Sequence, residues 1–393
     1  MTEQIYLNDS YIFECRSEIL EVIKDKDSIL LVFDKTPFFP GGGGQPSDKG
    51  NVNGVIIAEA FEKDGVVYHR LSEKSCSFDV GDNVCLQVDS SIRLERMRAH
   101  TGEHIVSGIA HKLFSVDNVG FHMDENALMT VDFNKYLDKS QLHIIEAEAN
   151  KCVMRDLKIS ANVFSVCDVQ KLNYRSKLEF ENDVRIVEID DVDRCACCAP
   201  HLNTTGQVGV IKILSSMSHR GGVRITLICG ERAFEELEKR YSQIMKISAL
   251  LCSEYDKADD AVAELIEANK NLKYDKDQLN IKLLDYVSSA IEEKDIIVEF
   301  FDSFSLDDLR IINNNLKAKC RLALLFSGSD AEGFCYSIMS EKLNLNRFVR
   351  DFNNFLGGRG GGRGFLVQGK VAATAEKIIE FLNEMKVENY ENA

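Results

Sequence analysis

The stretch of the chain between Gly230 and Gly328 contains neither glycine nor proline. Because these two residues interrupt helices most often, the stretch is free to form very long helical segments. Apolar residues recur in it at every seventh position from Leu237 to Tyr286, whereas the companion heptad positions are only partly apolar. One apolar seam and one mixed seam predict a coiled coil or a helical hairpin over residues 231–293, with polar residues setting its register. As one rod, about 60 residues would span roughly 90 Å.

The regions before and after this stretch carry mixed strand and helix signals. Residues 1–90 contain short runs of strand-forming residues separated by glycine and aspartate turns, which predicts a β-rich, barrel-like domain. Residues 91–230 combine a helical recurrence of apolar residues over 91–114 with later strand runs, so an α+β domain is expected there. Residues 294–393 predict a C-terminal α/β domain with a glycine-rich loop at 357–369. The expected fold class is α+β.

Composition narrows the class of function. No apolar run is long enough to span a bilayer, so we expect no membrane partner. The first residues lack the basic start and apolar run of a signal peptide, which predicts a cytoplasmic protein. The net charge of −16 argues against indiscriminate nucleic-acid binding, because that binding comes mainly from lysine and arginine. It leaves room for a local basic surface.

Three cysteines lie within four positions, at Cys195, Cys197 and Cys198. They could belong to a disulfide cluster, to a redox centre or to one half of a metal site. Twelve cysteines in 393 residues is a modest density. In a reducing cytosol thiols are more often buried, catalytic or metal-bound than paired, so the disulfide interpretation is disfavoured.

Two pairs of residues have the spacing of metal ligands. His100 and His104 are four residues apart on a predicted helix, so their rings project from one face and can grip one metal ion. Taken alone, this pair could also be two ordinary polar helix residues. Cys197 and His201 form a second pair with the same spacing, presented by a turn that contains Pro200. Three imidazoles and one thiolate make a ligand set that suits tetrahedral Zn²⁺.

The segment HTGEH, residues 100–104, also matches the H-x-x-E-H pattern of a group of zinc peptidases. In that pattern the glutamate, here Glu103, is the general base. Such sites complete their metal shell with a downstream carboxylate, whereas this chain offers a cysteine and histidine pair. A zinc peptidase therefore stays as an alternative. The competing interpretation of Glu103 is a solvated charge on the helix.

Four consecutive glycines lie in the segment TPFFPGGGGQPSDKG, residues 36–50. The segment is not a phosphate-binding P-loop, because no Gly-Lys-Ser/Thr follows and no helix is signalled. It is either a wide hairpin turn or a pocket wall in which backbone amides, Thr36 and Gln45 meet a small polar ligand.

Four motifs together resemble those of the editing domain of alanyl-tRNA synthetase, in the same order along the chain. They are TPFFPGGGGQPSDKG, HTGEH, CCAPHLNTTGQVG and GVRITLICG. The motifs are also similar to those of the free-standing alanyl-tRNA editing proteins of the AlaX type. GGRGGGRGFLVQG, residues 357–369, is similar to a signature of the C-terminal domain that alanyl-tRNA synthetase shares with DHH-type phosphoesterases. Because no aminoacylation domain precedes these motifs, the resemblance is to the long, free-standing editing form.

The resemblance implies a trans-editing hydrolase that cleaves the ester joining serine or glycine to tRNA for alanine. A pocket built for alanine cannot strongly reject glycine or an analogue that adds a hydroxyl, so a second hydrolytic site is needed. The zinc ligands implied by the resemblance are His100, His104, Cys197 and His201. Residues expected to act in the catalytic pocket are Thr36, Gln45 and Glu103, the first two in substrate recognition.

The acidic chain must still hold an RNA substrate. Candidate phosphate contacts are Arg93, Arg96, Arg98, Arg220, Arg224, Arg359 and Arg363. Affinity for tRNA is therefore expected to fall as salt is raised. We also expect a homodimer through the coiled coil or the C-terminal domain. A second alternative is a zinc-stabilised RNA-binding protein without catalysis, because structural zinc alone can supply much of the folding energy of a small module.

Overall fold

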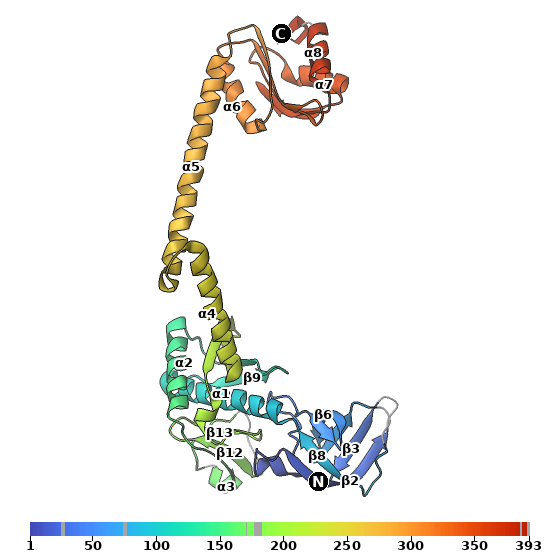
Figure 1. Cartoon of the computed structure of the whole chain (residues 1–393), viewed down its shortest axis with the longest axis vertical. Coiled ribbons are helices and arrows are strands. Elements are labelled where there is room, and N and C mark those ends of the chain that lie inside the picture. The colour runs from blue at the N-terminus through green and yellow to red at the C-terminus, as the bar shows by residue number, and fades with distance from the viewer. Residues whose placement is uncertain (25–27, 74–76, 170, 177–182, 386, 391–393) are drawn as a thin grey trace. The chain divides into compact units, whose positions relative to one another are not determined.

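The computed structural model describes residues 1–24, 28–73, 77–169, 171–176, 183–385 and 387–390. The chain divides into two compact units, Met1–Lys246 and Ile247–Ala393 (Figure 1). Both units combine helices and strands around their own hydrophobic cores, so the coarse prediction of an α+β protein is confirmed. The finer division into four segments stays a prediction.

The first unit begins with a closed barrel of six strands. Their order is β2-β3-β7-β6-β5-β8, and all neighbours run antiparallel. The strands are β2 (Glu14–Lys24), β3 (Ile29–Phe33), β5 (Gly50–Val52), β6 (Val55–Lys63), β7 (Val66–Leu71) and β8 (Asn83–Val88). Along β7 every second side chain is buried, because successive residues of a strand face opposite sides of the sheet. The predicted barrel-like arrangement of the N-terminal strands is confirmed.

A short parallel strand pair ties the N-terminus to the barrel. Strand β1 (Glu3–Gln4) pairs with β4 (Lys35–Thr36), and the 3-10 helix η1 (Ile5–Leu7) follows β1. Strand β4 leads directly into the four-glycine segment. The N-terminal residues and the glycine-rich segment therefore lie side by side.

Helix α1 (Ser90–Phe114) is the central element of the first unit, as the apolar recurrence over 91–114 predicts. Its first turn is capped by Asp89, whose side chain accepts from the amides of Ser91 and Ile92. The helix is buried through most of its length, which requires neighbours to approach closely. A Cβ on Gly102 would lie 2.3 Å from Cys229 Sγ, and a Cβ on Gly108 would lie 2.5 Å from the carbonyl oxygen of Val192. These glycines therefore let α1 pack tightly between two sheets.

The two sheets around α1 are antiparallel. One has the order β14-β15-β10-β9 and the other the order β11-β12-β13. Their strands are β9 (Asn118–Met123), β10 (Met129–Phe133), β11 (Ile159–Phe164), β12 (Val184–Ile189), β13 (Asp193–Ala196), β14 (Ile211–His219) and β15 (Gly222–Cys229). The helical elements here are α2 (Lys139–Met154), α3 (Val166–Val169) and η2 (Thr205–Val208). Helix α2 begins with a capping box formed by Asp138 and Gln141.

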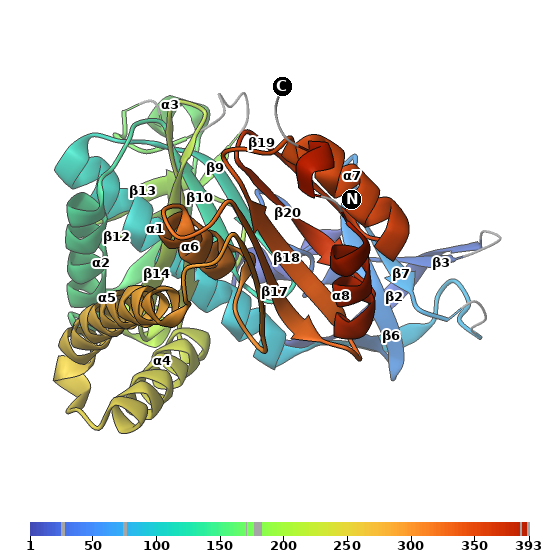
Figure 2. The same cartoon turned by 90° about the horizontal axis from the view of Figure 1, so that it is seen from above.

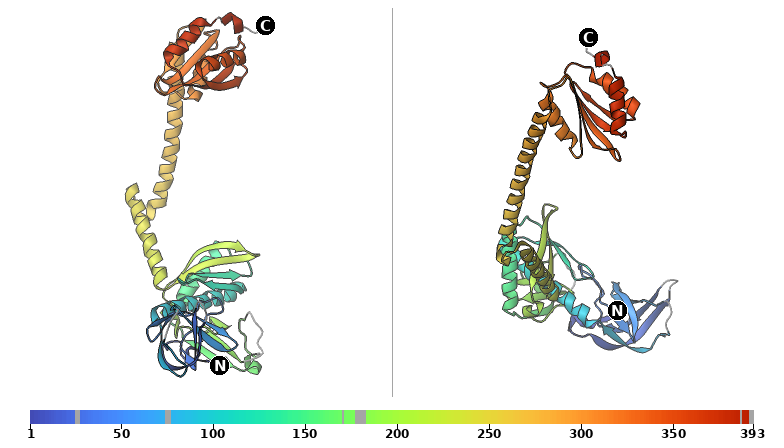
Figure 3. Two further views of the ribbon diagram at one scale, coloured as in Figure 1. Left: turned by 90° about the vertical axis from the view of Figure 1, so that its right-hand side faces the viewer. Right: turned by 45° about the horizontal axis from the view of Figure 1, so that its top comes forward.

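The glycine-free stretch forms two long helices rather than one rod. Helix α4 (Glu231–Leu251) ends in a left-handed residue, Cys252, with a φ of 51°. The amide of Ser253 donates to the carbonyl of Ser248 at 3.0 Å, which is the hydrogen bond of a Schellman cap. The 3-10 helix η3 (Tyr255–Lys257) precedes α5 (Ala258–Ala290), seen as one straight helix in Figure 3. Absence of glycine and proline did not prevent this break, because a cysteine takes the left-handed position.

The predicted heptad seam on α5 is exposed. Leu265, Leu272, Leu279 and Tyr286 are each more than half exposed. An exposed apolar seam needs a partner to form a coiled coil, so the coiled coil stays a prediction.

The second unit is built on a five-stranded sheet with the order β16-β17-β18-β20-β19. Strands β16 and β17 are parallel, and the other neighbours are antiparallel. The strands are β16 (Ile296–Phe301), β17 (Leu322–Ser329), β18 (Gly333–Met339), β19 (Arg359–Arg363) and β20 (Leu366–Val371). Helix α6 (Leu306–Leu316) packs on one face, while α7 (Leu345–Leu356) and α8 (Ala375–Glu384) pack on the other, followed by η4 (Val387–Tyr390) (Figure 2). Within the residues that the structure describes, no helix is long and apolar enough to cross a membrane.

Candidate metal centre

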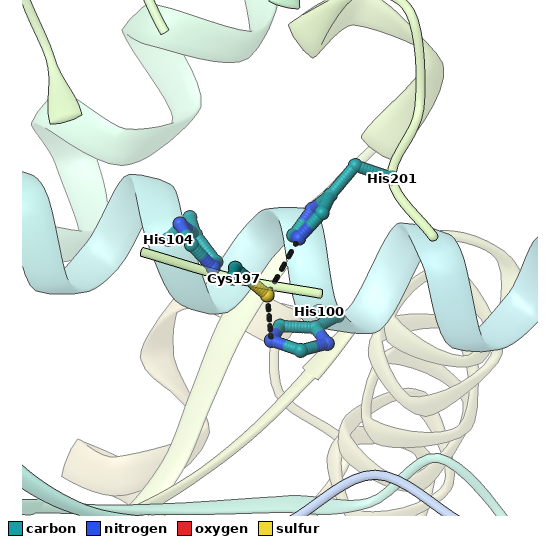
Figure 4. A group of neighbouring side chains, drawn as sticks. All are labelled: His100, His104, Cys197 and His201. Carbon is teal, nitrogen blue, oxygen red and sulfur yellow. Dashed lines mark hydrogen bonds between the residues drawn. The ribbon is translucent and has the colours of Figure 1, made fainter. Parts of the chain in front are cut away.

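The two pairs of predicted ligands come together in the first unit. His100 and His104 project from α1, and Cys197 and His201 lie on the segment that follows β13 (Figure 4). The four ligand atoms all lie within 4.8 Å of one another. The Cys197 Sγ atom is 3.3 Å from His201 Nε2 and 3.8 Å from His100 Nε2. The fold therefore joins two pairs that are almost a hundred residues apart into one cluster.

Each imidazole in the cluster has its other ring nitrogen, Nδ1, held by a neighbouring side chain. The three contacts are His100 to Gln45 Oε1 at 2.7 Å, His104 to Asp193 Oδ2 at 2.9 Å, and His201 to Thr101 Oγ1 at 3.2 Å. The oxygens of Gln45 and Asp193 can only accept, so His100 and His104 carry their protons on Nδ1 and leave Nε2 to face the cluster. Metal-binding histidines are oriented by such contacts in general. Both the four candidate ligands and the side chains that orient the three imidazoles are therefore suited to a metal ion.

The charges within the cluster favour the metal-binding form of the thiol. Burial alone would raise the pKa of the Cys197 thiol, but the imidazoles of His100 and His201 outweigh it and hold the pKa well below its usual range. Burial lowers the pKa of His201 to about 3, so this ring is neutral at physiological pH. A thiolate and a neutral imidazole are the forms that bind a metal.

His104 behaves differently because of Asp193. Burial lowers the pKa of His104, but the hydrogen bond to the Asp193 carboxylate overcomes this effect and raises the pKa well above its usual value. Arg175 pairs with the same carboxylate through two contacts, Nε to Oδ1 at 2.6 Å and Nη2 to Oδ2 at 2.7 Å. Without a metal, His104 therefore holds a proton that a metal ion must displace. Neither Asp193 nor Arg175 was identified from the sequence; only the position of Asp193, two residues before the cysteine cluster, could have suggested it.

A cavity of ≈ 950 Å³ opens next to the cluster. His100, His104 and Cys197 all form part of its wall. Aromatic side chains from several elements line it as well, and the ring of Phe121 stacks on that of His100 with centroids 4.9 Å apart. This volume lies at the upper end of the range for small-molecule sites.

The glycine-rich segment forms part of the cavity wall through its backbone. Gly41, Gly42 and Gly43 line the cavity, and all four glycines of the run have positive φ values. A Cβ on Gly44 would lie 2.3 Å from the carbonyl oxygen of Phe121, so glycine is required there. Gln45, which follows the run, is buried and bonds to His100 rather than lining the cavity. Its Nε2 atom has no hydrogen-bond partner within the described chain.

Thr36 does not reach the cavity. Its side chain is fully buried, and its hydroxyl lies 2.8 Å from Nε2 of His69 on strand β7. The Thr36 hydroxyl therefore faces His69, and a contact between Thr36 and a substrate stays a prediction. The sequence does not distinguish a substrate contact from a contact inside the barrel, because both would use the Thr36 hydroxyl.

Glu103 is buried, so it is not the solvated helix charge that was the competing interpretation. Its Oε1 atom accepts from Ser107 Oγ and from Asn118 Nδ2, the latter at 2.6 Å. Its Oε2 atom lies 4.0 Å from Nε2 of His104. Burial would raise the pKa of Glu103, but His104 and Arg175 outweigh it and lower the pKa below its usual value. Glu103 also lines the cavity.

Two of the candidate phosphate contacts are buried. The guanidinium of Arg93 is fully enclosed and pairs with Asp48, with its Nε atom 2.9 Å from both carboxylate oxygens. Arg96 donates to the carbonyl of Ser47 and to Glu125 Oε2, the latter at 2.8 Å. Both guanidinium groups are buried and paired with a carboxylate, so in this structure neither is exposed to a phosphate.

The other candidate arginines keep exposed surface. Arg359 and Arg363 lie on the exposed strand β19, and Arg220 lies in the turn between β14 and β15. Arg98 is half-buried, with Nε 3.4 Å from the carbonyl of Gln207. Arg224 is partly exposed and pairs with Asp132.

The two neighbouring cysteines occupy different places. Cys195 is half-buried beside His104 and Asp193, and burial raises its pKa to about 11. Cys198 is exposed at the cavity wall. Both thiols are free, as is that of Cys197. This arrangement gives Cys197 a place in the cluster with His100 and His201 that its neighbours do not share.

Three family models match separate parts of the chain. Residues 184–226 match the threonyl and alanyl tRNA synthetase second additional domain, which here contains Cys197 and His201. Residues 9–92 match the tRNA synthetases class II (A) family, and this match falls mainly on the barrel. Residues 293–388 match the DHHA1 domain, which corresponds to the sheet of the second unit.

Known proteins are similar to this chain along nearly all of its length. The alanyl-tRNA editing protein AlaX-L of Pyrococcus horikoshii is 24% identical, with 97% of each chain covered. Alanine–tRNA ligases are 30% identical in Pyrococcus abyssi, over 96% of this chain, and 26% identical in Clostridioides difficile, over 89% of it. This chain spans only 43% of the length of either ligase. The resemblance seen in the motifs is therefore confirmed: the chain is similar over nearly its whole length to the alanyl-tRNA editing protein AlaX-L.

Proposed function

We propose that this chain is an aminoacyl-tRNA deacylase that hydrolyses the ester of serine or glycine wrongly attached to tRNA for alanine. The observation that carries the proposal is the His100, His104, Cys197 and His201 cluster, which lies at the wall of a ≈ 950 Å³ cavity. Similarity to an alanyl-tRNA editing protein supports the choice of substrate. Serine and glycine are the amino acids that an alanine pocket rejects poorly.

The metal is proposed to be zinc. Three imidazoles and one thiolate form a borderline-soft set that zinc prefers, and Gln45, Asp193 and Thr101 orient the rings. When bound, zinc would supply a positive charge that can hold the substrate or polarise its ester. Because four protein ligands fill a tetrahedral shell, positioning of the substrate is the role that this ligand set favours.

The side chains and backbone of the cavity wall provide the remaining functions. Gly41, Gly42 and Gly43 line the cavity without side chains, so the backbone of this segment can contact a polar substrate closely. Phe121 covers one face of His100 and limits the access of water to the cluster. Glu103 offers a carboxylate, for which two roles are open: it can take a proton from the attacking water, or it can bind a cationic part of the substrate.

The tRNA is proposed to contact arginines that keep some exposed surface. Arg98 lies on α1, and Arg359 and Arg363 lie in the second unit. These few contacts predict an affinity that falls with salt. A cytoplasmic protein is proposed, and the apolar seam of α5 is proposed to pair with a second copy of the chain in a homodimer.

A zinc peptidase is less well supported. Its pattern requires Glu103 to act as base with a carboxylate as the third ligand, whereas Cys197 and His201 complete the cluster here. A non-catalytic zinc protein would not need a cavity beside its metal. Both alternatives predict that mischarged tRNA survives.

The decisive experiment incubates the zinc-loaded protein with serine-, glycine- and alanine-charged tRNA for alanine and follows deacylation. The first two esters should be hydrolysed and His104→Ala should abolish the activity. His143→Ala, which replaces an exposed histidine on α2, is the matched control and should retain it. Survival of both mischarged tRNAs in the presence of zinc-loaded protein would refute the proposed function.

A further inference from the structure

The two carboxylate oxygens of Glu103 have different surroundings. Both hydrogen bonds to this side chain end on Oε1, from Ser107 Oγ and Asn118 Nδ2. Oε2 lies on the side of the metal cluster, 4.0 Å from His104 Nε2. Both Glu103 and Asn118 line the cavity. One oxygen is therefore fixed by the protein, and the other is the one that a ligand in the cavity can meet.

The orientation of Asn118 is determined by its backbone neighbour. Its Oδ1 accepts the amide of Gly120 at 3.0 Å, so its NH₂ group must be the part that points to Glu103. The same NH₂ group is 3.3 Å from Ser107 Oγ. Ser107 and Asn118 therefore hold the carboxylate in one position, because both donate to the same oxygen and also contact one another.

The cationic group nearest to this buried carboxylate is His104, whose Nε2 atom lies 4.0 Å from Oε2, beyond hydrogen-bond distance. Within the described residues, no lysine or arginine nitrogen lies within 4.0 Å of it. The guanidinium of Arg175 is already engaged, because its Nε and Nη2 atoms each donate a hydrogen bond to a carboxylate oxygen of Asp193. Among the described residues no hydrogen-bond donor reaches Oε2, so a donor-rich cationic group bound in the cavity would supply the hydrogen bond that this buried oxygen lacks.

We propose that Glu103 binds the α-ammonium group of the aminoacyl ester through Oε2. This inference rests on the proposed function and narrows the substrate class to esters of amino acids whose amino group is free. A primary ammonium matches the site because it is small, cationic and rich in donors. N-acylated aminoacyl esters and peptidyl esters lack the charge and present a bulky amide instead. The role of Glu103 is then to position the ester, not to transfer a proton.

The test compares seryl-tRNA with the same tRNA after chemical N-acetylation of the serine. The wild-type protein should hydrolyse the free-amine ester about ten- to a hundredfold faster in kcat/KM, which is the range expected for a hydrogen bond to a charged group. Hydrolysis of neither ester would refute the proposed function. Equal hydrolysis of both would overturn this inference and leave the proposed function standing.

The Glu103→Gln variant separates positioning from proton transfer. Glutamine keeps the oxygen that Ser107 and Asn118 contact but loses the charge, so the preference for the free-amine ester should fall to near unity. A general base would instead make the variant slow toward both esters by the same factor, which would overturn the assignment. Asp117→Asn is the matched control, because Asp117 also lines the cavity but is half-exposed and paired with His111 at 2.8 Å. Its preference should match that of the wild type. Zinc content and thermal unfolding of each variant confirm that the metal and the fold are retained.

Discussion

Replacing Asp193 by asparagine tests how the metal cluster is held. Asp193 accepts the Nδ1 proton of His104 at 2.9 Å and receives two further bonds from Arg175 at 2.6 and 2.7 Å. Asparagine keeps one accepting oxygen but has no charge, so it cannot satisfy both partners. His104 then loses its fixed orientation, and the half-buried guanidinium of Arg175 loses its counter-charge.

The expected loss of zinc affinity is about 10- to 100-fold, the usual effect of removing such a partner. This corresponds to about 1.4 to 2.8 kcal/mol. A second effect has the opposite sign, because Asp193 raises the pKa of His104 and so makes a proton compete with the metal. The wild-type affinity should therefore rise with pH, the slope should be shallower in the variant, and the difference between them should be largest at about pH 9.

The assay is competition for zinc with a colorimetric chelator at several values between about pH 7 and about pH 9. Asp191→Asn is the control, because Asp191 is exposed and its left-handed backbone suits asparagine. A variant affinity within twofold of the wild type at every pH would show that His104 is not a ligand, or that Asp193 does not orient it.

Three further predictions concern zinc binding, the pH dependence of stability and the affinity for tRNA. Cys197→Ser should abolish stoichiometric zinc binding, whereas Cys198→Ser should retain it; metal analysis after dialysis decides between these outcomes. Burial lowers the pKa of His69 to about 4. Between about pH 6.5 and about pH 4, the His69 imidazole is therefore protonated in the unfolded chain but neutral in the folded one. Stability should therefore fall by up to about 3 kcal/mol as the pH is lowered through this window, and His69→Phe should flatten the dependence in urea unfolding. Replacing both Arg359 and Arg363 by alanine should lower the slope of log affinity for tRNA against log salt by up to about 2, measured by filter binding; an unchanged slope would exclude these two residues as phosphate contacts.

Local features of the fold were predictable because they depend on spacing. Alternation of side chains indicated the barrel strands, and the apolar recurrence over 91–114 indicated α1. The end of α4 was not predictable in this way. Its cap places Cys252 in the left-handed region, where glycine is the usual residue, so the sequence contained no signal for the break.

It was harder to predict which of several candidate residues of the same type are buried and which are exposed. Arg93 and Arg98 lie on the same helix, yet the first is enclosed with Asp48 and the second keeps exposed surface. Likewise, Thr36 follows the expected motif but bonds to His69 inside the barrel. Burial depends on what packs over a side chain, and that is not encoded in its immediate neighbours.

The sequence by itself determined the ligand types and their spacing, and the helical spacing of His100 and His104 places both rings on one face of α1. Only the tertiary structure decided that the two pairs meet, since α1 and the segment after β13 are brought together by the packing of two sheets. It also decided the partners of each ring, Gln45 from the glycine-rich segment, Asp193 from β13 and Thr101 from α1 itself. Contacts between segments that are distant in the sequence depend on how the whole core packs, so a local sequence pattern does not predict them.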